Sequence, residues 1–316
     1  MPRIAVIVPL YNKTRYIDRC LDAVFSQSLT DFELIVVNDA STDGGEAKVA
    51  LRRDPRLTLV SQPNAGPGSA RNHGARLATA PLLAFLDADD AWDPQYLKES
   101  AERLEAAHPT AASLTWSMMV HPRRSSTSLR WPHLGIPEGE FRATPQTPAG
   151  IIIAMLANML PSSTVMRKAI FEELGGYYAK YRCLYSEDAW LYLKMLLRYT
   201  ALFDYRPLSI RFEDASELAV NLTGVRPIEP FLIDPESITK TCPDAMRPLL
   251  REVLARRALK TASVYGYWGE PAQSRQLIKQ FVSPGDWRLP WFPTALVSAT
   301  PLGPLAGKLA RMAGHR

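Results

Sequence analysis

The chain has 316 residues, of which 47% are hydrophobic, and this composition supports a large folded domain and excludes a disordered protein. Its net charge of +5 is unevenly placed: residues 242–316 hold 11 Lys and Arg against 4 Asp and Glu, whereas residues 1–241 hold 26 against 28. The three cysteines have neither metal-ligand nor redox-motif spacing, and no secretion signal precedes the strand-like run that starts at Ile4. We therefore expect a cytoplasmic protein with a basic C-terminal region.

Strand and helix patterns alternate through the first part of the chain. Apolar, partly β-branched runs lie at residues 4–9, 34–37, 57–60 and 82–86, and polar loops with helical spacing after them separate these runs. Strands that alternate with helices predict a parallel sheet with right-handed crossovers. The sequence therefore predicts an α/β fold with helices flanking a mostly parallel central sheet.

Three acidic residues follow the last of these strands directly. In an extended chain Asp87 and Asp89 project to the same side, close enough to share one divalent cation and its phosphate ligands. Helix capping is the alternative role for these acids, and we assign Asp90 to it because a helical pattern follows Pro94. Capping does not explain Asp87 and Asp89 at the mouth of an apolar strand.

Tyr11 and Asp39 follow two other strands. Since the carboxyl ends of parallel strands converge on one crevice, these side chains should meet the acidic pair there. An aromatic face and a carboxylate suit a uracil-like base, and Arg71, near a helix start, offers a planar fork of donors to a base or phosphate. Taken singly, each has a structural alternative: packing for Tyr11, an Asx turn for Asp39 and a solvated helix position for Arg71.

Glycines before the third helix raise the question of a dinucleotide site. Gly66 and Gly68 match only part of the fingerprint, because its third glycine is missing, and no P-loop lysine motif occurs. A sugar-phosphate nucleotidyltransferase would need a glycine-rich, Arg-containing loop after Val8, and that loop is absent.

Taken together, these strings resemble the family 2 glycosyltransferases of the GT-A fold. Five strings carry the resemblance: residues 7–12, 36–44, 65–72 and 85–90, and the Gly175-Gly176-Tyr177 string with residues 186–190 after it. They occur in the order typical of the family and cover residues 4 to about 198.

The resemblance implies an activity. Such enzymes move a sugar from a nucleoside diphosphate, here UDP by the uracil argument, to a hydroxyl of a glycan or lipid-linked acceptor, with inversion and with Mn²⁺ or Mg²⁺. The alternative is a non-catalytic subunit that binds a nucleotide sugar or glycan in the same crevice.

The resemblance also implies roles for single residues. Tyr11 and Asp39 would hold the base, Asp87 the ribose or a metal-linked phosphate, Asp89 the metal, and Asp188 would be the catalytic base. The donor-binding set that it implies is Pro9, Tyr11, Asn12, Asp39, Arg71, Asp87 and Ala88.

The acceptor side of the predicted site centres on one helix start. Ser186 is placed to cap a helix that begins at Glu187, which puts Glu187 and Asp188 in its first turn. Acids are common in first turns for dipole reasons alone, and the family match decides for the catalytic role. Trp190 either packs or forms an acceptor platform.

One string departs from the family pattern. Members often carry a Tyr-Arg-x-His string whose His completes the metal site, whereas residues 210–214 here read Ile-Arg-Phe-Glu-Asp. Oxygen ligands suit Mg²⁺ or Mn²⁺, so Glu213 or Asp214 could substitute. We favour the alternative that both are surface loop acids.

These patterns divide the predicted chain into a glycosyltransferase domain and an appendage. We expect residues 1–225 to form the domain, with a nucleotide-sugar half at 1–110 and an acceptor half at 111–225. The remaining residues, 226–316, should form a helical, basic appendage.

Further elements are predicted inside these parts. Residues 111–120 read as a strand, 161–167 as an edge strand, and the Pro- and Arg-rich stretch 121–148 as a mobile excursion on the acceptor side. Helices are expected at 249–259 and 273–282.

Aromatic and basic residues gather near the C-terminus. Trp287, Trp291 and Phe292 beside Arg288 resemble an interfacial anchor, which with the basic surplus predicts a peripheral contact at the inner face of a membrane. Packing of these aromatics on a core is the alternative. No base-reading motif supports nucleic-acid binding.

Overall fold

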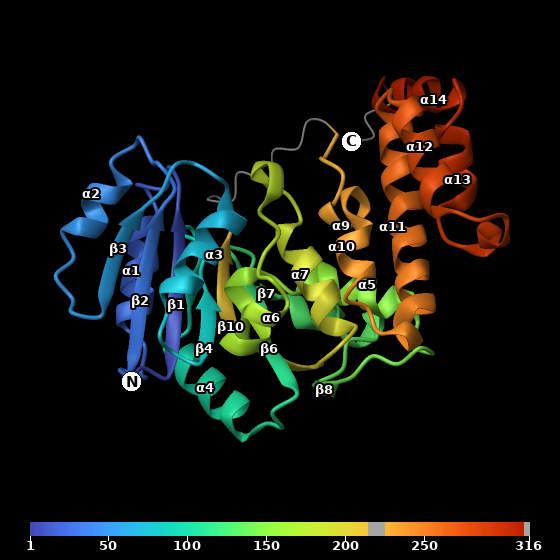
Figure 1. Ribbon diagram of the computed structural model, residues 1–316. Coiled ribbons are helices and arrows are strands. Elements are labelled where there is room, and N and C mark those ends of the chain that lie inside the picture. The colour runs from blue at the N-terminus through green and yellow to red at the C-terminus, as the bar shows by residue number, and fades with distance from the viewer. Residues whose placement is uncertain (214–224, 313–316) are drawn as a thin grey trace. The chain divides into compact units, whose positions relative to one another are not determined.

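The computed structural model describes residues 1–213 and 225–312 (Figure 1). The chain forms two compact units. Within the described part, the first is built from residues 1–144 and 151–213 and the second from residues 145–150 and 225–312.

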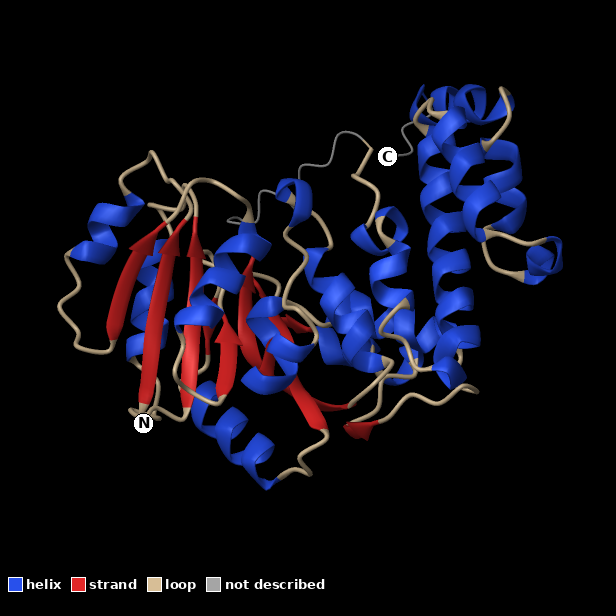
Figure 2. Cartoon of the chain, viewed as in Figure 1, coloured by secondary structure: helices blue, strands red, loops and turns tan. Residues whose placement is uncertain are grey.

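The first unit is an α/β structure built around one sheet (Figure 2). Its elements are β1 (Ile4–Leu10), α1 (Ile17–Phe25), β2 (Phe32–Asn38), α2 (Gly45–Ala50), β3 (Leu57–Ser61), α3 (Pro67–Leu77), β4 (Leu82–Phe85), β5 (Ala91–Trp92), α4 (Tyr96–Ala106), β6 (Ala111–His121), β7 (Ser125–Ser126), β8 (Gly139–Phe141), α5 (Ala149–Asn158, which begins in the second unit), β9 (Thr164–Arg167), α6 (Lys168–Glu173), α7 (Glu187–Leu196) and β10 (Thr200–Phe212). The strand order is β3-β2-β1-β4-β9-β6-β10-β5, with β7 on β6 and β8 on β10.

The first four strands form the parallel part of the sheet, as predicted. Ile7 in β1 pairs with Ile35 in β2 and Phe85 in β4, and β3 continues the parallel ladder beyond β2. The runs of Val, Ile and Leu in β1, β2 and β4 are buried on both faces, as expected where helices cover both sides of a parallel sheet, whereas the edge strand β3 is partly exposed.

Alternate residues of β1 meet helices on opposite faces of the sheet. Val6 and Val8 belong to the core that α1 and α4 complete, whereas Ile7 lies against α3. A Cβ added to Gly74 in α3 would lie 2.5 Å from Cγ2 of Ile7, so glycine permits this helix to approach the sheet closely. The helix that carries Arg71 is thereby fixed against the central strand.

The second half of the sheet contains antiparallel pairs. The strand predicted at 111–120 is confirmed as β6, and β10 runs parallel to it. The prediction of an edge strand at 161–167 is wrong, because β9 lies between β4 and β6 and pairs antiparallel with both. Pro161 lies in a 3₁₀ turn before β9, so its missing N–H leaves the ladder intact.

The stretch 121–148 holds more regular structure than predicted. It contains β7 and β8, and it is anchored by Trp131, which is fully buried. The indole ring packs edge-on against Phe203 and Tyr205 of β10, with centroids 5.9 and 5.6 Å away.

The second unit is helical. Its further elements are α9 (Pro230–Ile233), α10 (Pro235–Thr239), α11 (Arg247–Tyr267), α12 (Pro271–Phe281), α13 (Phe292–Ser298) and α14 (Leu302–Met312). The helices predicted at 249–259 and 273–282 are confirmed as parts of α11 and α12. The last two helices were not predicted, because their prolines count against helix, yet Pro293 and Pro304 lie in first turns, where proline is tolerated. Within residues 1–213 and 225–312, no helix is long and apolar enough to cross a membrane.

Candidate active site

Three strand ends bring polar side chains to one edge of the sheet. In the parallel ladder, Leu10 at the end of β1 lies beside Asn38 at the end of β2, and β4 ends on the other side of β1. Tyr11 and Asp39 are the residues that follow, and Asp87 comes two positions after β4. This is the carboxyl edge, where open α/β sheets bind ligands. The Tyr11 side chain is 44% exposed, so its ring is open to solvent there.

Asp39 is buried and accepts hydrogen bonds from a distant loop. Gln62 Nε2 donates to Oδ1 at 2.8 Å, and the backbone N–H groups of Ala65 and Gly66 donate to Oδ1 and Oδ2, both at 2.9 Å. This is not an Asx turn, because the donors are more than twenty residues away in sequence. An ionised carboxylate has about four acceptor positions, so one remains for a ligand donor.

Three members of the predicted donor set shape this edge from the backbone. Pro9 pairs with Val37 inside the ladder, and Ala88, between the two acids in the sequence, is buried. Asn12 has a left-handed backbone, with φ +50°, and its Oδ1 accepts from the Thr42 N–H at 2.8 Å. Asn12 therefore joins the loops that follow β1 and β2.

Arg71 connects the acidic pair to α7. Its guanidinium is 4% exposed; Nη2 donates to Asp87 Oδ1 at 2.5 Å and Nη1 to Glu187 Oε1 at 2.8 Å. The cation also lies 5.3 Å from the centroid of the Tyr177 ring. Arg71 is thus no solvated helix residue, and its bridge joins the sheet edge to the first turn of α7.

Asp89 is paired with a lysine from the loop after β1. Lys13 Nζ lies 3.0 Å from Asp89 Oδ2, and Arg19 Nη2 donates to the Asp89 carbonyl at 2.8 Å. Burial, and then the charge of Asp87, raise the pKa of the Asp89 carboxyl. Desolvation is the larger cause, so the shift mainly records the burial of this carboxyl, and the Lys13 charge acts in the opposite direction.

The assignment of Asp90 to a helix cap is wrong. Helix α4 begins at Tyr96, and Asp93 is the acid at its start, with Oδ1 accepting from the Gln95 N–H at 2.9 Å. Asp90 is buried before β5 and hydrogen-bonded to Ser162. Burial, followed by Asp87 and Asp89, raises its pKa well above the usual range.

Helix α7 begins at Glu187, as predicted, with Asp188 in its first turn. The predicted cap is wrong: Ser186 has φ +60°, and in this left-handed conformation its side chain makes no capping hydrogen bond. Asp188 Oδ1 accepts from the Ala189 N–H at 2.7 Å. Burial first, and then the neighbouring Glu187 charge, raise the pKa of Asp188 to about 7, while Arg71 acts in the opposite direction.

The two glycines before and within α3 have a packing role. A Cβ added to Gly68 would lie 2.7 Å from the Tyr178 carbonyl oxygen and 3.1 Å from Glu187 Cγ. Gly66 has φ +89°, and a Cβ there would lie 3.0 Å from the Cys183 carbonyl oxygen. These glycines therefore let the segment 178–187 lie directly on the start of α3, which explains them without a dinucleotide.

The chain matches a known protein family. The family profile described as Glycosyl transferase family 2 matches residues 5–173, which is more than half of the chain. The chain belongs to this family. It is a glycosyltransferase, as the five strings implied.

Curated relatives match about a third of this glycosyltransferase. An uncharacterized glycosyltransferase, EpsJ, from Bacillus subtilis is 38% identical over 108 residues, which are 33% of this chain and 31% of EpsJ. The succinoglycan biosynthesis protein ExoW of Rhizobium meliloti is 40% identical over 103 residues, 31% of this chain and 32% of ExoW. The chain thus matches about a third of the length of these relatives.

Solved structures resemble this glycosyltransferase over nearly its whole length. TarS 1–349 of S. aureus in complex with UDP-GlcNAc has a TM-score of 0.73 at 18% identity, covering 99% of this chain and 92% of TarS 1–349. The mannosyltransferase PcManGT of Pyrobaculum calidifontis, in complex with GDP-Man and Mn²⁺, has a TM-score of 0.58 at 19% identity, with coverage of 100% and 88%. At these identities the likeness concerns the fold, and the predicted GT-A fold is confirmed.

The remaining predicted site residues of the glycosyltransferase lie in other surroundings. Trp190 is buried, with its ring 4.1 Å from Lys194 Nζ and 5.5 Å from the Tyr178 ring, so it packs. Glu213 Oε2 lies 3.2 Å from Arg123 Nε, in an ion pair typical of a surface loop acid. Asp214 lies outside the described residues.

The acidic pair fits a metal that takes further ligands from a substrate. Among the residues that the structure describes, no group of three His, Cys, Asp or Glu side chains is placed to hold a metal. Mg²⁺ at phosphate sites needs only one or two carboxylates together with phosphate oxygens and water. Asp89, whose carboxylate is paired with Lys13 at 3.0 Å, has the hard oxygen donors for this role, and Asp87 lies two positions before it in the chain.

Two polar residues at this edge were missed from the sequence. Lys13 lies with Tyr11 and Asn12 in the loop after β1. Its position at the carboxyl edge of the sheet could have identified it as a site residue. Ser162, which hydrogen-bonds Asp90 and whose Oγ accepts from the Asp87 N–H at 3.1 Å, lies in a 3₁₀ turn and gave no signal.

Proposed function

We propose that this glycosyltransferase moves a sugar from a UDP-linked donor to an acceptor hydroxyl, with inversion at the anomeric carbon. The observation that carries the proposal is the Arg71 bridge, which holds Asp87 at the sheet edge and Glu187 beside Asp188 in one hydrogen-bonded unit. A donor at the sheet edge and an acceptor at the start of α7 would then face each other. This arrangement suits a single in-line displacement.

Asp188 is the proposed general base. A carboxylate with a pKa of about 7 is a better proton acceptor at neutral pH than an ordinary aspartate, and half of it is still ionised at that pH. In the reaction it takes the proton of the acceptor hydroxyl as that oxygen bonds to the anomeric carbon. The bond from this carbon to the diphosphate oxygen breaks on the opposite face, and UDP leaves with the electron pair.

Asp87 and Asp89 are the proposed metal-side carboxylates. A bound Mg²⁺ or Mn²⁺ would neutralise charge that develops on the departing diphosphate. Asp89 would hold the ion, and Asp87 would contact the ribose or a metal-linked phosphate. PcManGT, which has the same fold, was solved in complex with GDP-Man and Mn²⁺, and this complex favours the proposal.

Tyr11 and Asp39 are the proposed recognition elements for uracil. The exposed Tyr11 ring offers a stacking face, and the acceptor position left on Asp39 suits the uracil N3–H. Cytosine lacks that hydrogen, so UDP should bind better than CDP. TarS 1–349, crystallised with UDP-GlcNAc, is consistent with a uridine donor on this fold.

The proposed acceptor is a glycan or lipid-linked glycan of polysaccharide synthesis, used at the inner face of a membrane. The succinoglycan biosynthesis relatives support an acceptor of polysaccharide synthesis. The basic C-terminal region supports a location at the inner face of a membrane.

A donor panel tests the proposal. We expect one UDP-sugar to be consumed in the presence of a divalent metal and to transfer its sugar to an added acceptor, with product of inverted configuration by NMR. Asp89→Ala should abolish transfer in a protein that still folds. Full activity of this variant in a chelator would rule out the metal role, and binding of donor without any transfer would favour a binding subunit.

A further inference from the structure

Helix α13 in the second unit buries its small side chains and exposes its large apolar ones. Its buried residues are the small Ala295 and Ser298, whereas the larger Leu296 and Val297 are about half exposed. A surface helix of a soluble protein normally buries its large apolar side chains and exposes polar ones. The pattern of α13 is the reverse.

Close packing of small residues causes this inversion. A Cβ added to Gly266 in α11 would lie 2.1 Å from the Ser298 carbonyl oxygen, and one added to Gly303 in α14 would lie 2.7 Å from Ser298 Cα. Ser298 Oγ also donates to the Ser263 carbonyl at 3.2 Å. With these backbones in contact, no space remains inside for large side chains. The outward position of Leu296 and Val297 therefore follows from the packing.

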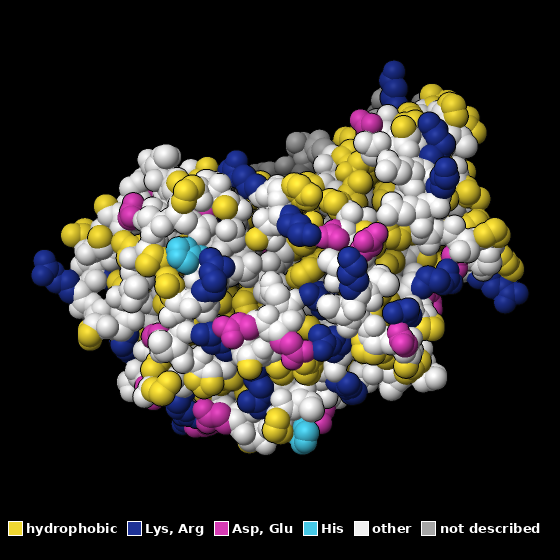
Figure 3. Space-filling model, viewed as in Figure 1, with side chains coloured by type: hydrophobic (Ala, Val, Ile, Leu, Met, Phe, Trp, Pro, Cys, Tyr) yellow, Lys and Arg dark blue, Asp and Glu magenta, His cyan; other side chains and the backbone are white. Residues whose placement is uncertain are grey.

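The exposed side chains form one apolar segment. Of the sixteen large hydrophobic residues that are exposed in the described chain, six lie between 287 and 305. We call these six the apolar face: Trp287, Trp291, Leu296, Val297, Leu302 and Leu305. Trp287 is 59% and Leu302 61% exposed, and Figure 3 shows hydrophobic side chains gathered over the C-terminal helices.

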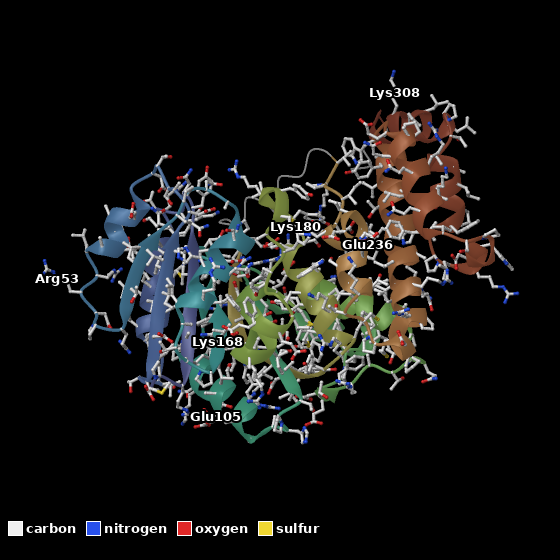
Figure 4. All side chains as sticks on the ribbon, viewed as in Figure 1. Arg53, Glu105, Lys168, Lys180, Glu236 and Lys308 are labelled. Atoms are coloured by element: carbon white, nitrogen blue, oxygen red, sulfur yellow. The ribbon has the colours of Figure 1, made fainter. Side chains whose placement is uncertain are left out.

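The segment of the sequence that carries the apolar face is basic. Residues 284–316 hold four basic residues and a single acid, Asp286. That acid is buried and paired with Arg251, at 3.0 Å between Oδ1 and Nη2, so it adds little negative potential outside. Lys308 extends from α14 into solvent (Figure 4), and Arg288 lies over the ring of Trp287 with its guanidinium 4.7 Å from the centroid.

We propose that the apolar face docks this glycosyltransferase on an anionic membrane surface. Leucines would enter the acyl boundary, the two tryptophans would lie at the headgroup level that this side chain prefers, and the basic residues would meet lipid phosphates. A second copy of the chain is a poorer occupant, because a symmetric contact would bring the same basic residues together. The inference extends the proposed location of the enzyme and does not depend on the transfer step.

Vesicle co-sedimentation of the full chain tests this docking. We expect binding to vesicles that contain phosphatidylglycerol, weaker binding as salt rises, and little binding to phosphatidylcholine alone. Arg288→Glu and Lys308→Glu should each weaken partitioning about fivefold or more, since a basic residue near such a surface contributes about 1 kcal/mol. Leu302→Ser with Leu305→Ser should weaken it by at least about tenfold, from the lost burial of two leucines.

Matched controls come from the first unit. Leu51 and Leu129 are also highly exposed leucines, and Leu51→Ser and Leu129→Ser should leave vesicle binding unchanged. Transfer to a soluble acceptor should be the same for all these variants, so a failure of docking is separate from a failure of the proposed reaction. Absence of binding to anionic vesicles at low salt would overturn the inference. A dimer in solution that Leu302→Ser dissociates, without vesicle binding, would assign the apolar face to a second copy instead.

Discussion

The two sides of the candidate active site are held in place by different means. On the donor side, Tyr11, Asp39 and Asp87 follow strands whose register fixes where each strand ends. On the acceptor side, the segment 178–187 lies on glycines of α3, and its neighbour Tyr177 is held by Asn72, whose side chain bonds the Tyr177 N–H and carbonyl, both at 2.8 Å. The segment includes three non-glycine residues with positive φ: Tyr181, Arg182 and Ser186.

This difference indicates that Asp188, the proposed catalytic base, is positioned by tertiary contacts. A positive φ costs a non-glycine residue on the order of 1 kcal/mol, so the segment depends on its surroundings to keep that conformation. We therefore expect donor binding to tolerate changes on the acceptor side, whereas transfer should not.

Removal of the proposed base should have the largest effect. Asp188→Asn keeps the size of the side chain and removes its proton acceptor, and we expect transfer to fall by about 10²–10⁴-fold. Calorimetric binding of UDP should change little, because the proposed nucleotide site lies at the strand ends. Glu172→Gln, at an exposed acid of α6, is the control and should keep full activity. Loss of UDP binding in Asp188→Asn would contradict the separation of the two sides.

The pH dependence of transfer should report the ionisation of Asp188. Since Asp188 must be ionised to accept a proton and its pKa is about 7, kcat should rise with pH up to about 7, with a slope of about tenfold per unit in the acid range. The stability contribution of this group has the opposite sign. Its folded pKa lies above the unfolded value of about 3.9, so that contribution is complete below pH 4 and is lost as pH rises through 7.

The pH experiment has a clear contradicting result. Transfer rates that are flat from pH 5 to 8, measured with a donor that is saturating at each pH, would show that Asp188 does not titrate as the base. Asp188→Asn should remove the stability change as well as the activity, and thermal unfolding across this range checks it.

Closing the space beneath the acceptor segment should have a smaller effect. Gly68→Ala puts a Cβ against the Tyr178 carbonyl and Glu187, and overpacking of this kind costs about 1–3 kcal/mol of the free energy of unfolding. We expect a lower denaturation midpoint and slower transfer, with UDP affinity retained. Gly285→Ala is the control, because no atom lies within 4 Å of a Cβ added there. Equal effects of the two substitutions would refute the packing role.

Loss of the stacking face should give the smallest effect and should appear on the donor side alone. Tyr11→Ala removes an exposed ring, and stacking of a base on an aromatic side chain is worth about 1–3 kcal/mol. The UDP dissociation constant should rise accordingly, with thermal stability unchanged. A variant that binds UDP normally would remove Tyr11 from the donor site.

The sequence predicted most of the parallel strands and the loops at their carboxyl ends, because the information there is local. Runs of Val, Ile and Leu between polar loops identify strands, and the carboxyl edge of a parallel sheet is a property of the topology. The bridge from Arg71 to Glu187 was not predictable in this way, since 116 positions separate the two residues. Asp90 was assigned wrongly because a helical pattern follows it in the sequence. That pattern is the same whether the acid caps the helix or is buried before it.

The C-terminal region shows the same limit of local patterns. Its helices α13 and α14 escaped prediction because each contains a proline, which locally counts against a helix. In α13 the close approach of Gly266 and Gly303 leaves room only for the small Ser298, and the larger Leu296 and Val297 face solvent. The family resemblance ends well before these helices, so no motif indicated them.

The most direct test of the proposed reaction measures donor binding and transfer on the same variant. For Asp188→Asn, UDP affinity by calorimetry and sugar transfer by product NMR should separate: affinity should match the unmodified enzyme, and transfer should fall by at least about 10²-fold. Transfer at the unmodified rate would contradict the assignment of Asp188 as the base that completes a glycosyltransferase site.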